Sequence, residues 1–170
     1  MPCANPLDLL SLARTFGAMW SVELSGPERT FELGRALGRV AEPGVVVALV
    51  GELGAGKTLF AQGVGAALEV EGQVLSPTFV LVSEHPGRLP LLHADLYRLG
   101  PGEVEGLGLE EALERWPGVA LVEWPERAPE VLPPDHLELR LSRLGEGRLA
   151  ELHPHGPRSE ALLARLEQRW

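Results

Sequence analysis

The chain has 170 residues, of which 45% are hydrophobic and 23% charged, and these values are typical of one globular domain with its own core. No apolar run reaches the roughly 18 residues of a membrane span, and no basic cluster precedes the early leucines, so we expect neither a membrane protein nor a secreted one. The net charge of −9 argues against unaided binding of nucleic acid. The single cysteine, Cys3, excludes an internal disulfide and fits a reducing cytoplasm.

Strand-like and helix-like patterns alternate along the chain. Apolar spacing predicts a helix over 31–40, and the unbroken apolar run over 45–50 predicts a strand buried on both faces. A glycine-rich turn and a helix from about 57 to 68 follow. The later expected elements are extended segments at 74, 79–82 and 90–93, an acidic helix over 103–116, a buried strand over 119–122, late strands over 137–141 and 148–152, and a terminal helix over 159–169 with Ser159 as its N-cap.

The turn between the first buried strand and its helix carries a phosphate-binding motif. Its sequence, GELGAGKT over residues 51–58, fits G-x-x-x-x-G-K-[ST] without a mismatch. Glycines let the backbone N–H groups approach phosphate oxygens, and the helix directs its positive end to the same anion. Lys57, the chain's only lysine, is expected to reach the β- and γ-phosphates, and Thr58 to offer a hydroxyl to Mg²⁺. The predicted nucleotide-binding residues of this segment are Gly51, Glu52, Leu53, Gly54, Ala55, Gly56, Lys57, Thr58 and Leu59.

Acidic and polar residues stand where other expected strands end. Glu123 directly follows the buried strand over 119–122, and Asp95 follows the strand that begins at 90. Thr78 lies in a Ser-Pro-Thr-Phe stretch and could meet the metal as a switch threonine does. Carboxylates and hydroxyls at this edge of a parallel sheet are suited to a magnesium site. We therefore predict Lys57, Asp95 and Glu123 as catalytic, and the side chains of Thr58, Thr78, Asp95 and Glu123 as metal ligands.

The alternation of elements around such a motif predicts the fold class. We expect an α/β domain like the P-loop NTPases, with a mostly parallel central sheet flanked by helices and with antiparallel late strands. This single domain is expected over residues 20–170. Residues 1–19 are interpreted as an N-terminal extension.

Four motifs in this order resemble the TsaE (YjeE) family: GELGAGKT, SPTF, HADLYRL and LVEWPE, at 51–58, 76–79, 93–99 and 121–126. The resemblance covers about 21–152. It implies a small bacterial ATPase required for the threonylcarbamoyl modification (t6A) of adenosine 37 in tRNA, acting with the TsaB–TsaD heterodimer and meeting tRNA only through these partners. It further implies that Thr58 and Glu123 hold Mg²⁺ with ATP, that Asp95 belongs to the catalytic centre and that Trp124 lies beside the nucleotide. It also suggests that the segment Ser25–Thr30 lies near the base.

Two other functions stay open on the residues alone. One is a nucleotide-dependent interaction module in which hydrolysis is incidental. The other is a small-molecule kinase, which is disfavoured because the segment 99–117 has one arginine among five glutamates and makes a poor phosphate lid. No glutamine or arginine is assigned to the attacking water. His93 is interpreted as structural, and His153 and His155 as part of a solvated turn.

Overall fold

The computed structural model describes residues 18–77 and 81–170. Within them, a seven-stranded sheet has the order β1-β7-β6-β2-β5-β4-β3. The strands are β1 (Trp20–Leu24), β2 (Val45–Val50), β3 (Val82–His85), β4 (Leu91–Asp95), β5 (Val119–Glu123), β6 (Leu137–Leu144) and β7 (Gly147–Pro154). The helices are α2 (Pro27–Val40), α3 (Lys57–Ala67), α4 (Leu109–Arg115), α5 (Pro157–Glu167) and the 3-10 turns η1 (Pro125–Arg127) and η2 (Pro129–Val131).

The centre of the sheet is parallel and its margins are antiparallel. Strands β6, β2, β5 and β4 run parallel, whereas β7 and β1 continue the sheet antiparallel beyond β6, and β3 pairs antiparallel with β4. The expected fold class, with its parallel centre and antiparallel late strands, is confirmed. Because β2, β4 and β5 are parallel, their carboxyl ends meet at one edge of the sheet.

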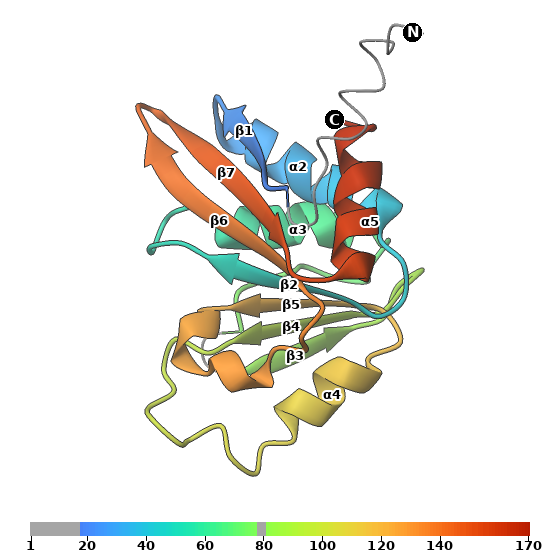
Figure 1. Cartoon of the computed structure of the whole chain (residues 1–170), viewed down its shortest axis with the longest axis vertical. Coiled ribbons are helices and arrows are strands. Elements are labelled where there is room, and N and C mark those ends of the chain that lie inside the picture. The colour runs from blue at the N-terminus through green and yellow to red at the C-terminus, as the bar shows by residue number, and fades with distance from the viewer. Residues whose placement is uncertain (1–17, 78–80) are drawn as a thin grey trace, which may run out of the picture.

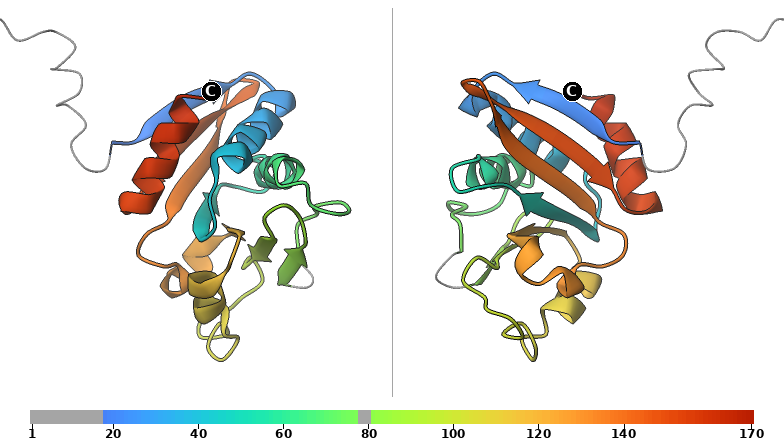
Figure 2. Two further views of the ribbon diagram at one scale, coloured as in Figure 1. Left: turned by 90° about the vertical axis from the view of Figure 1, so that its right-hand side faces the viewer. Right: turned by 60° about the vertical axis from the view of Figure 1, so that its left-hand side comes forward.

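Helices cover both faces of the sheet (Figure 1). One apolar core lies between the sheet and the helices α2, α3 and α5, and a second core lies on the other face beside α4, η1 and η2. Figure 2 shows the long β6–β7 hairpin between β1 and β2, with α5 packed against it. The central strands are buried on both faces, which explains their unbroken apolar runs.

Glycines allow α2 and α3 to pack closely. A Cβ atom on Gly34 would lie 2.1 Å from the backbone oxygen of Phe60, and one on Gly63 would lie 2.0 Å from that of Phe31. Both glycines therefore permit backbone contact between the helices. This contact holds α3, and with it the phosphate-binding turn, against the rest of the domain.

Several local predictions were wrong. The strand β1 was not expected, and the acidic helix begins only at Leu109, because Gly106 and Gly108 have positive φ angles of 82° and 68° that end any regular helix before it. Ser159 is not the N-cap of α5: Gly156 is, and Ser159 occupies the third helical position, where its hydroxyl accepts a hydrogen bond from the Gly156 N–H. Of the expected strand 79–82, Val82 lies in β3, Leu81 lies in a bend before it, and residues 79 and 80 lie outside the described residues; Val74 lies in no strand.

The predicted extension over 1–19 falls outside the described residues except for its last two. In the part of the chain that the structure describes, no helix is both long and apolar enough to cross a membrane.

Candidate functional site

A cavity of about 400 Å³ opens at the carboxyl edge of the parallel strands. The turn after β2 and the first residues of α3 form one wall, and the ends of β4 and β5 form the other. The residues that line it are Glu52, Leu53, Gly54, Ala55, Gly56, Lys57, Thr58, Leu59, Ser76, Asp95, Tyr97, Glu123 and Trp124. The motif and the acidic strand ends, which are far apart in the sequence, therefore meet in one place.

The backbone of the turn adopts the shape that its glycines permit. Gly54 and Gly56 have φ angles of 77° and 109°, a region that residues with a Cβ atom rarely occupy. Gly56 is also the N-cap of α3, so the amino end of the helix faces the cavity. Arg148 in β7 holds the turn from behind, because its guanidinium donates hydrogen bonds to the carbonyl oxygens of Ala55 at 3.1 Å and Gly54 at 3.0 Å.

The Lys57 ammonium is buried at the centre of this turn. It donates hydrogen bonds to the carbonyl oxygens of Gly51 and, at 3.3 Å, Glu52. The Trp124 ring lies over it, with its centroid 3.9 Å from Nζ. Burial lowers the pKa of Lys57, and the charges of Glu123, Glu126 and Asp95 oppose that shift. Phosphate oxygens entering the cavity would meet this positive charge at the amino end of α3.

Two carboxylates face each other across adjacent strands. Asp95 and Glu123 occupy paired positions at the ends of β4 and β5 and are only 4% and 3% exposed. The Asp95 carboxylate accepts hydrogen bonds from the Ser76 hydroxyl at 2.8 Å and from the Tyr97 N–H at 2.9 Å. Both carboxylates are thus fixed within the cavity wall near the cationic turn.

The buried His93 orients Glu123. Its Nε2 lies 2.8 Å from the Glu123 Oε1, and its Nδ1 has no hydrogen-bond partner among the described residues. Since an ionised carboxylate only accepts hydrogen bonds, Nε2 carries the proton in this pair. A second proton on Nδ1 would be buried without an acceptor, so the neutral tautomer fits the site best.

Aromatic residues close one side of the cavity. Trp124 follows β5 in the left-handed conformation, with φ 56°, and its ring packs on Tyr97 with centroids 4.9 Å apart. A residue other than glycine in this conformation stores backbone strain, which is commonly retained at functional sites. In this conformation the indole lies against the Lys57 ammonium.

The structure brings most of the predicted site residues together, and their roles stay predictions. Residues 52–59, together with Asp95, Glu123 and Trp124, line the cavity of about 400 Å³. Gly51 does not line it, although its carbonyl contacts Lys57. Thr30 lines an adjoining cavity of about 190 Å³ that shares Gly54 and Gly56 with the first. Thr78 lies outside the described residues.

Three contributions were missed by sequence reasoning. His93 was interpreted as structural, although a period of two from Asp95 already puts both on one face of β4. Ser76 was seen only as part of the motif around Thr78. Arg148 reaches the turn from a strand more than ninety positions away, and no local pattern could have shown that contact.

The sheet order, with a phosphate loop between β2 and α3 at a parallel edge, defines a P-loop fold. In agreement, the crystal structure of Bacillus subtilis YdiB superimposes with a TM-score of 0.79 at 31% identity, covering 91% of this chain and 97% of that one.

Residues 24–150 match the sequence model of the family described as threonylcarbamoyl adenosine biosynthesis protein TsaE. Curated relatives carry the name tRNA threonylcarbamoyladenosine biosynthesis protein TsaE. The Nostoc sp. protein is 43% identical over 145 residues, which is 82% of this chain and 89% of the relative, and the Bacillus subtilis protein is 41% identical over 121 residues, 71% and 75% of the two chains. The chain belongs to the TsaE family, which takes part in the biosynthesis of threonylcarbamoyladenosine in tRNA.

Proposed function

We propose that this chain binds ATP with Mg²⁺ and hydrolyses it as a subunit that acts through a TsaB–TsaD complex in the t6A modification of tRNA adenosine 37. The observation that carries the proposal is the meeting of Lys57, Asp95 and Glu123 around one cavity beside a phosphate loop. The volume of this cavity, about 400 Å³, lies within the range of small-molecule sites, roughly 300–1,000 Å³.

Phosphate recognition falls to the loop and to Lys57. Backbone N–H groups at the start of α3 point toward the cavity, and the helix dipole favours an anion there. The Lys57 ammonium is compact and can exchange its carbonyl contacts for phosphate oxygens. An arginine would be too large and planar to do so inside the loop.

The donor set fits Mg²⁺. The Thr58 hydroxyl and the carboxylates of Glu123 and Asp95 are hard oxygen ligands on three elements around the same cavity. When bound with nucleotide, the ion would neutralise charge that develops on the phosphates. His93 keeps the Glu123 carboxylate oriented for that contact. Thr78 stays a further candidate ligand.

Asp95 is the best-placed group to orient a water molecule for attack. Its two oxygens accept hydrogen bonds from the Ser76 hydroxyl and from the Tyr97 N–H, which fixes the plane of the carboxylate at the cavity wall. In this role Asp95 binds the water, aligns it and accepts its proton as the water oxygen bonds to the γ-phosphorus and the bond to the β,γ-bridging oxygen breaks, with ADP as the leaving group.

Two further residues border the nucleotide in this proposal. Thr30 in the adjoining cavity would lie toward the base, since both cavities share the phosphate loop. Trp124 would move off the Lys57 ammonium, or stack beside the nucleotide, when phosphate enters.

Action through partners follows from the charge. The net charge of −9 disfavours unaided binding of the isolated chain to tRNA phosphates. A role in tRNA modification is therefore proposed to run through another protein that holds the tRNA, and TsaB–TsaD is the partner proposed. The compartment of this reaction is the bacterial cytoplasm.

The test measures ATP hydrolysis and t6A formation by the full chain with Mg²⁺, with and without TsaB–TsaD and tRNA. We expect Asp95→Asn to lower turnover by about 10²-fold or more while ATP binding is kept. Asp135→Asn, the same substitution far from the cavity, is the control and should retain turnover. Tight tRNA binding by the isolated chain, or full activity of Asp95→Asn, would contradict the proposal.

A nucleotide-dependent interaction module is the second candidate. It is favoured by exposed apolar side chains around the cavity, since Leu53 at the tip of the loop is 68% exposed and Leu75 is 56% exposed. Lys57→Ala separates the two functions. If this variant binds TsaB–TsaD normally and supports t6A formation without turnover, binding and not hydrolysis is the function.

A further inference from the structure

Three metal-ligating side chains gather on the β6–β7 hairpin, away from the cavity. His136 directly precedes β6, Glu138 lies within it and His155 directly follows β7. The backbone N–H of His155 donates a hydrogen bond to the His136 carbonyl at 3.0 Å, which continues the strand pairing past Leu137 and Pro154. His136 and Glu138 are two residues apart and so share one face, which His155 joins from across the ladder.

Their ligand atoms converge. One nitrogen from each imidazole and one carboxylate oxygen all lie within 4.8 Å of one another. The two imidazole rings stack with centroids 4.4 Å apart and an angle of 15° between their planes, and the His155 Nε2 is 3.7 Å from the Glu138 Oε2. To bind one ion, the two imidazoles would rotate out of this stacked arrangement, because their lone pairs lie in the ring planes.

The protonation of His136 suits a ligand. Its Nδ1 lies 2.7 Å from the Pro133 carbonyl oxygen and donates to it, so Nε2 keeps its lone pair. A backbone carbonyl that fixes the tautomer in this way is the usual outer-shell partner of a metal-bound histidine.

We propose that His136, Glu138 and His155 form a binding site for a divalent transition metal ion of the zinc type, with water completing the coordination. Two imidazoles and one carboxylate are a known zinc ligand set, and the nitrogen ligands select such ions over Mg²⁺. Arg140 donates a hydrogen bond to Oε1 of Glu138 and so holds this carboxylate with Oε2 toward His155.

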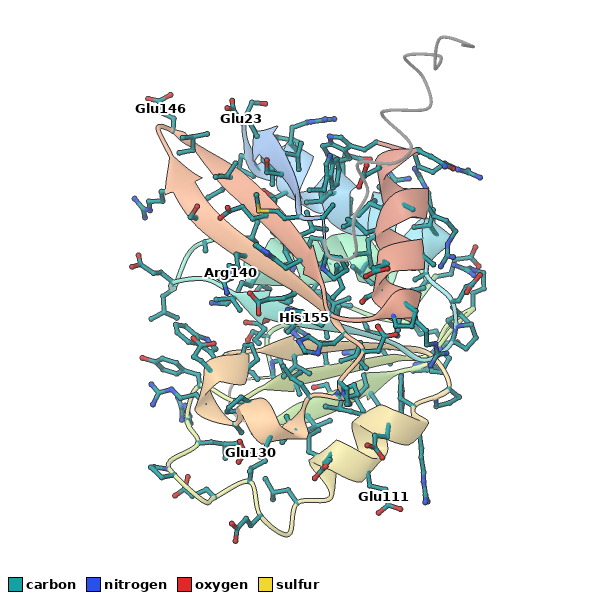
Figure 3. All side chains as sticks on the ribbon, viewed as in Figure 1. Glu23, Glu111, Glu130, Arg140, Glu146 and His155 are labelled. Carbon is teal, nitrogen blue, oxygen red and sulfur yellow. The ribbon has the colours of Figure 1, made fainter. Side chains whose placement is uncertain are left out.

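This site is separate from the phosphate loop. Leu137 and Leu139 face the core beside α2 and α3, so Glu138 between them faces the opposite surface of the sheet. Glu123 lies two residues after Leu121 and faces the core side with it. In Figure 3 the labelled side chains of Arg140 and His155 project from the β6–β7 region of the sheet. A bound ion would tie the start of β6 to the connection between β7 and α5.

The test titrates the full chain with Zn²⁺ against a chromophoric chelator, without nucleotide. All samples carry Cys3→Ser, because the only cysteine could bind zinc by itself. We expect one Zn²⁺ per chain and a higher melting temperature with Zn²⁺. His155→Gln and Glu138→Gln should lose more affinity than the roughly 10–100-fold that removal of an outer-shell partner causes.

Matched controls keep the result interpretable. His85→Gln changes a histidine in β3, at the far edge of the sheet, and Glu146→Gln changes an exposed glutamate in the β6–β7 turn; both should bind Zn²⁺ like the parent. Unchanged melting without metal would show that the variants fold, and His155 is exposed enough for this to be expected. Substituted Co²⁺ should give a visible spectrum that His155→Gln removes. Absence of stoichiometric Zn²⁺ binding in the parent, or equal binding by His155→Gln, would overturn the proposal.

Discussion

The hydrogen bond from His93 to Glu123 gives the sharpest prediction about the site. His93→Leu fills the same space with an apolar side chain and removes the hydrogen-bond donor to the Glu123 carboxylate, which is 3% exposed. A hydrogen bond to a charged group contributes about 1.5–3 kcal/mol, and a domain of this size loses roughly 2–4 °C of melting temperature per kcal/mol, so we expect a loss of about 3–12 °C.

The same substitution should act on the metal dependence of hydrolysis. If Glu123 holds Mg²⁺, loss of its orienting partner should raise the Mg²⁺ concentration needed for half-maximal ATPase activity by roughly 10–100-fold. His93→Gln keeps an N–H donor and should recover part of both losses. A merely structural histidine would lower the melting temperature without changing the Mg²⁺ dependence.

The assay pairs a thermal melt with ATPase rates over a Mg²⁺ series. His85→Leu is the control, because His85 is a half-buried histidine on the neighbouring strand β3. A His93→Leu variant with the melting temperature and Mg²⁺ dependence of the parent would refute the reasoning.

Three further predictions concern the loop and the frame that holds it. Gly63→Ala places a Cβ atom 2.0 Å from the Phe31 carbonyl oxygen and should destabilise the fold by about 1–3 kcal/mol in denaturant unfolding; parental stability would show that α2 and α3 can separate easily. Asp135→Ala removes the carboxylate that accepts hydrogen bonds from two N–H groups in the first turn of α5, at 2.7 and 3.0 Å, and should cost about 0.5–2 kcal/mol; an unchanged melt would contradict that capping role. Thr58→Ala should weaken ATP binding measured with Mg²⁺ but not with EDTA, and equal losses in both would remove Thr58 from the metal site.

Local sequence patterns were sufficient to predict the phosphate loop and the acidic residues at the strand ends. The phosphate loop is one continuous motif between a buried strand and a helix, so its position and its backbone shape followed from the glycines and Lys57. Glu123 and Asp95 were predictable because each ends a buried strand, and parallel strands bring such ends to one edge.

Contacts between distant segments could not be predicted in this way. Arg148 reaches the loop from β7. Asp135, which precedes β6, accepts a hydrogen bond from the first turn of α5, so the local sequence around Ser159 did not predict the capping of this helix correctly. His136, Glu138 and His155 lie together because of the register in which β6 and β7 pair. His155 is far from the other two in the sequence, so no local pattern shows the cluster.

The prediction of secondary structure failed where glycines interrupt a helix and where a strand is short. The acidic composition over 103–116 favoured one helix, but Gly106 and Gly108 turn the chain before Leu109. The five residues of β1 alternate too briefly to be recognised, and this strand is specified by its pairing with β7.

The central claim is that the phosphate loop hydrolyses ATP, and the most direct test is the steady-state ATPase rate of the full chain and of Lys57→Ala with Mg²⁺ present. Lys57 is the only lysine, so no other residue of its type can replace it. We expect hydrolysis by the parent, stimulated by TsaB–TsaD, and neither hydrolysis nor tight ATP binding by Lys57→Ala, with Lys57→Arg inactive as well. Turnover by Lys57→Ala at the parental rate would contradict the account.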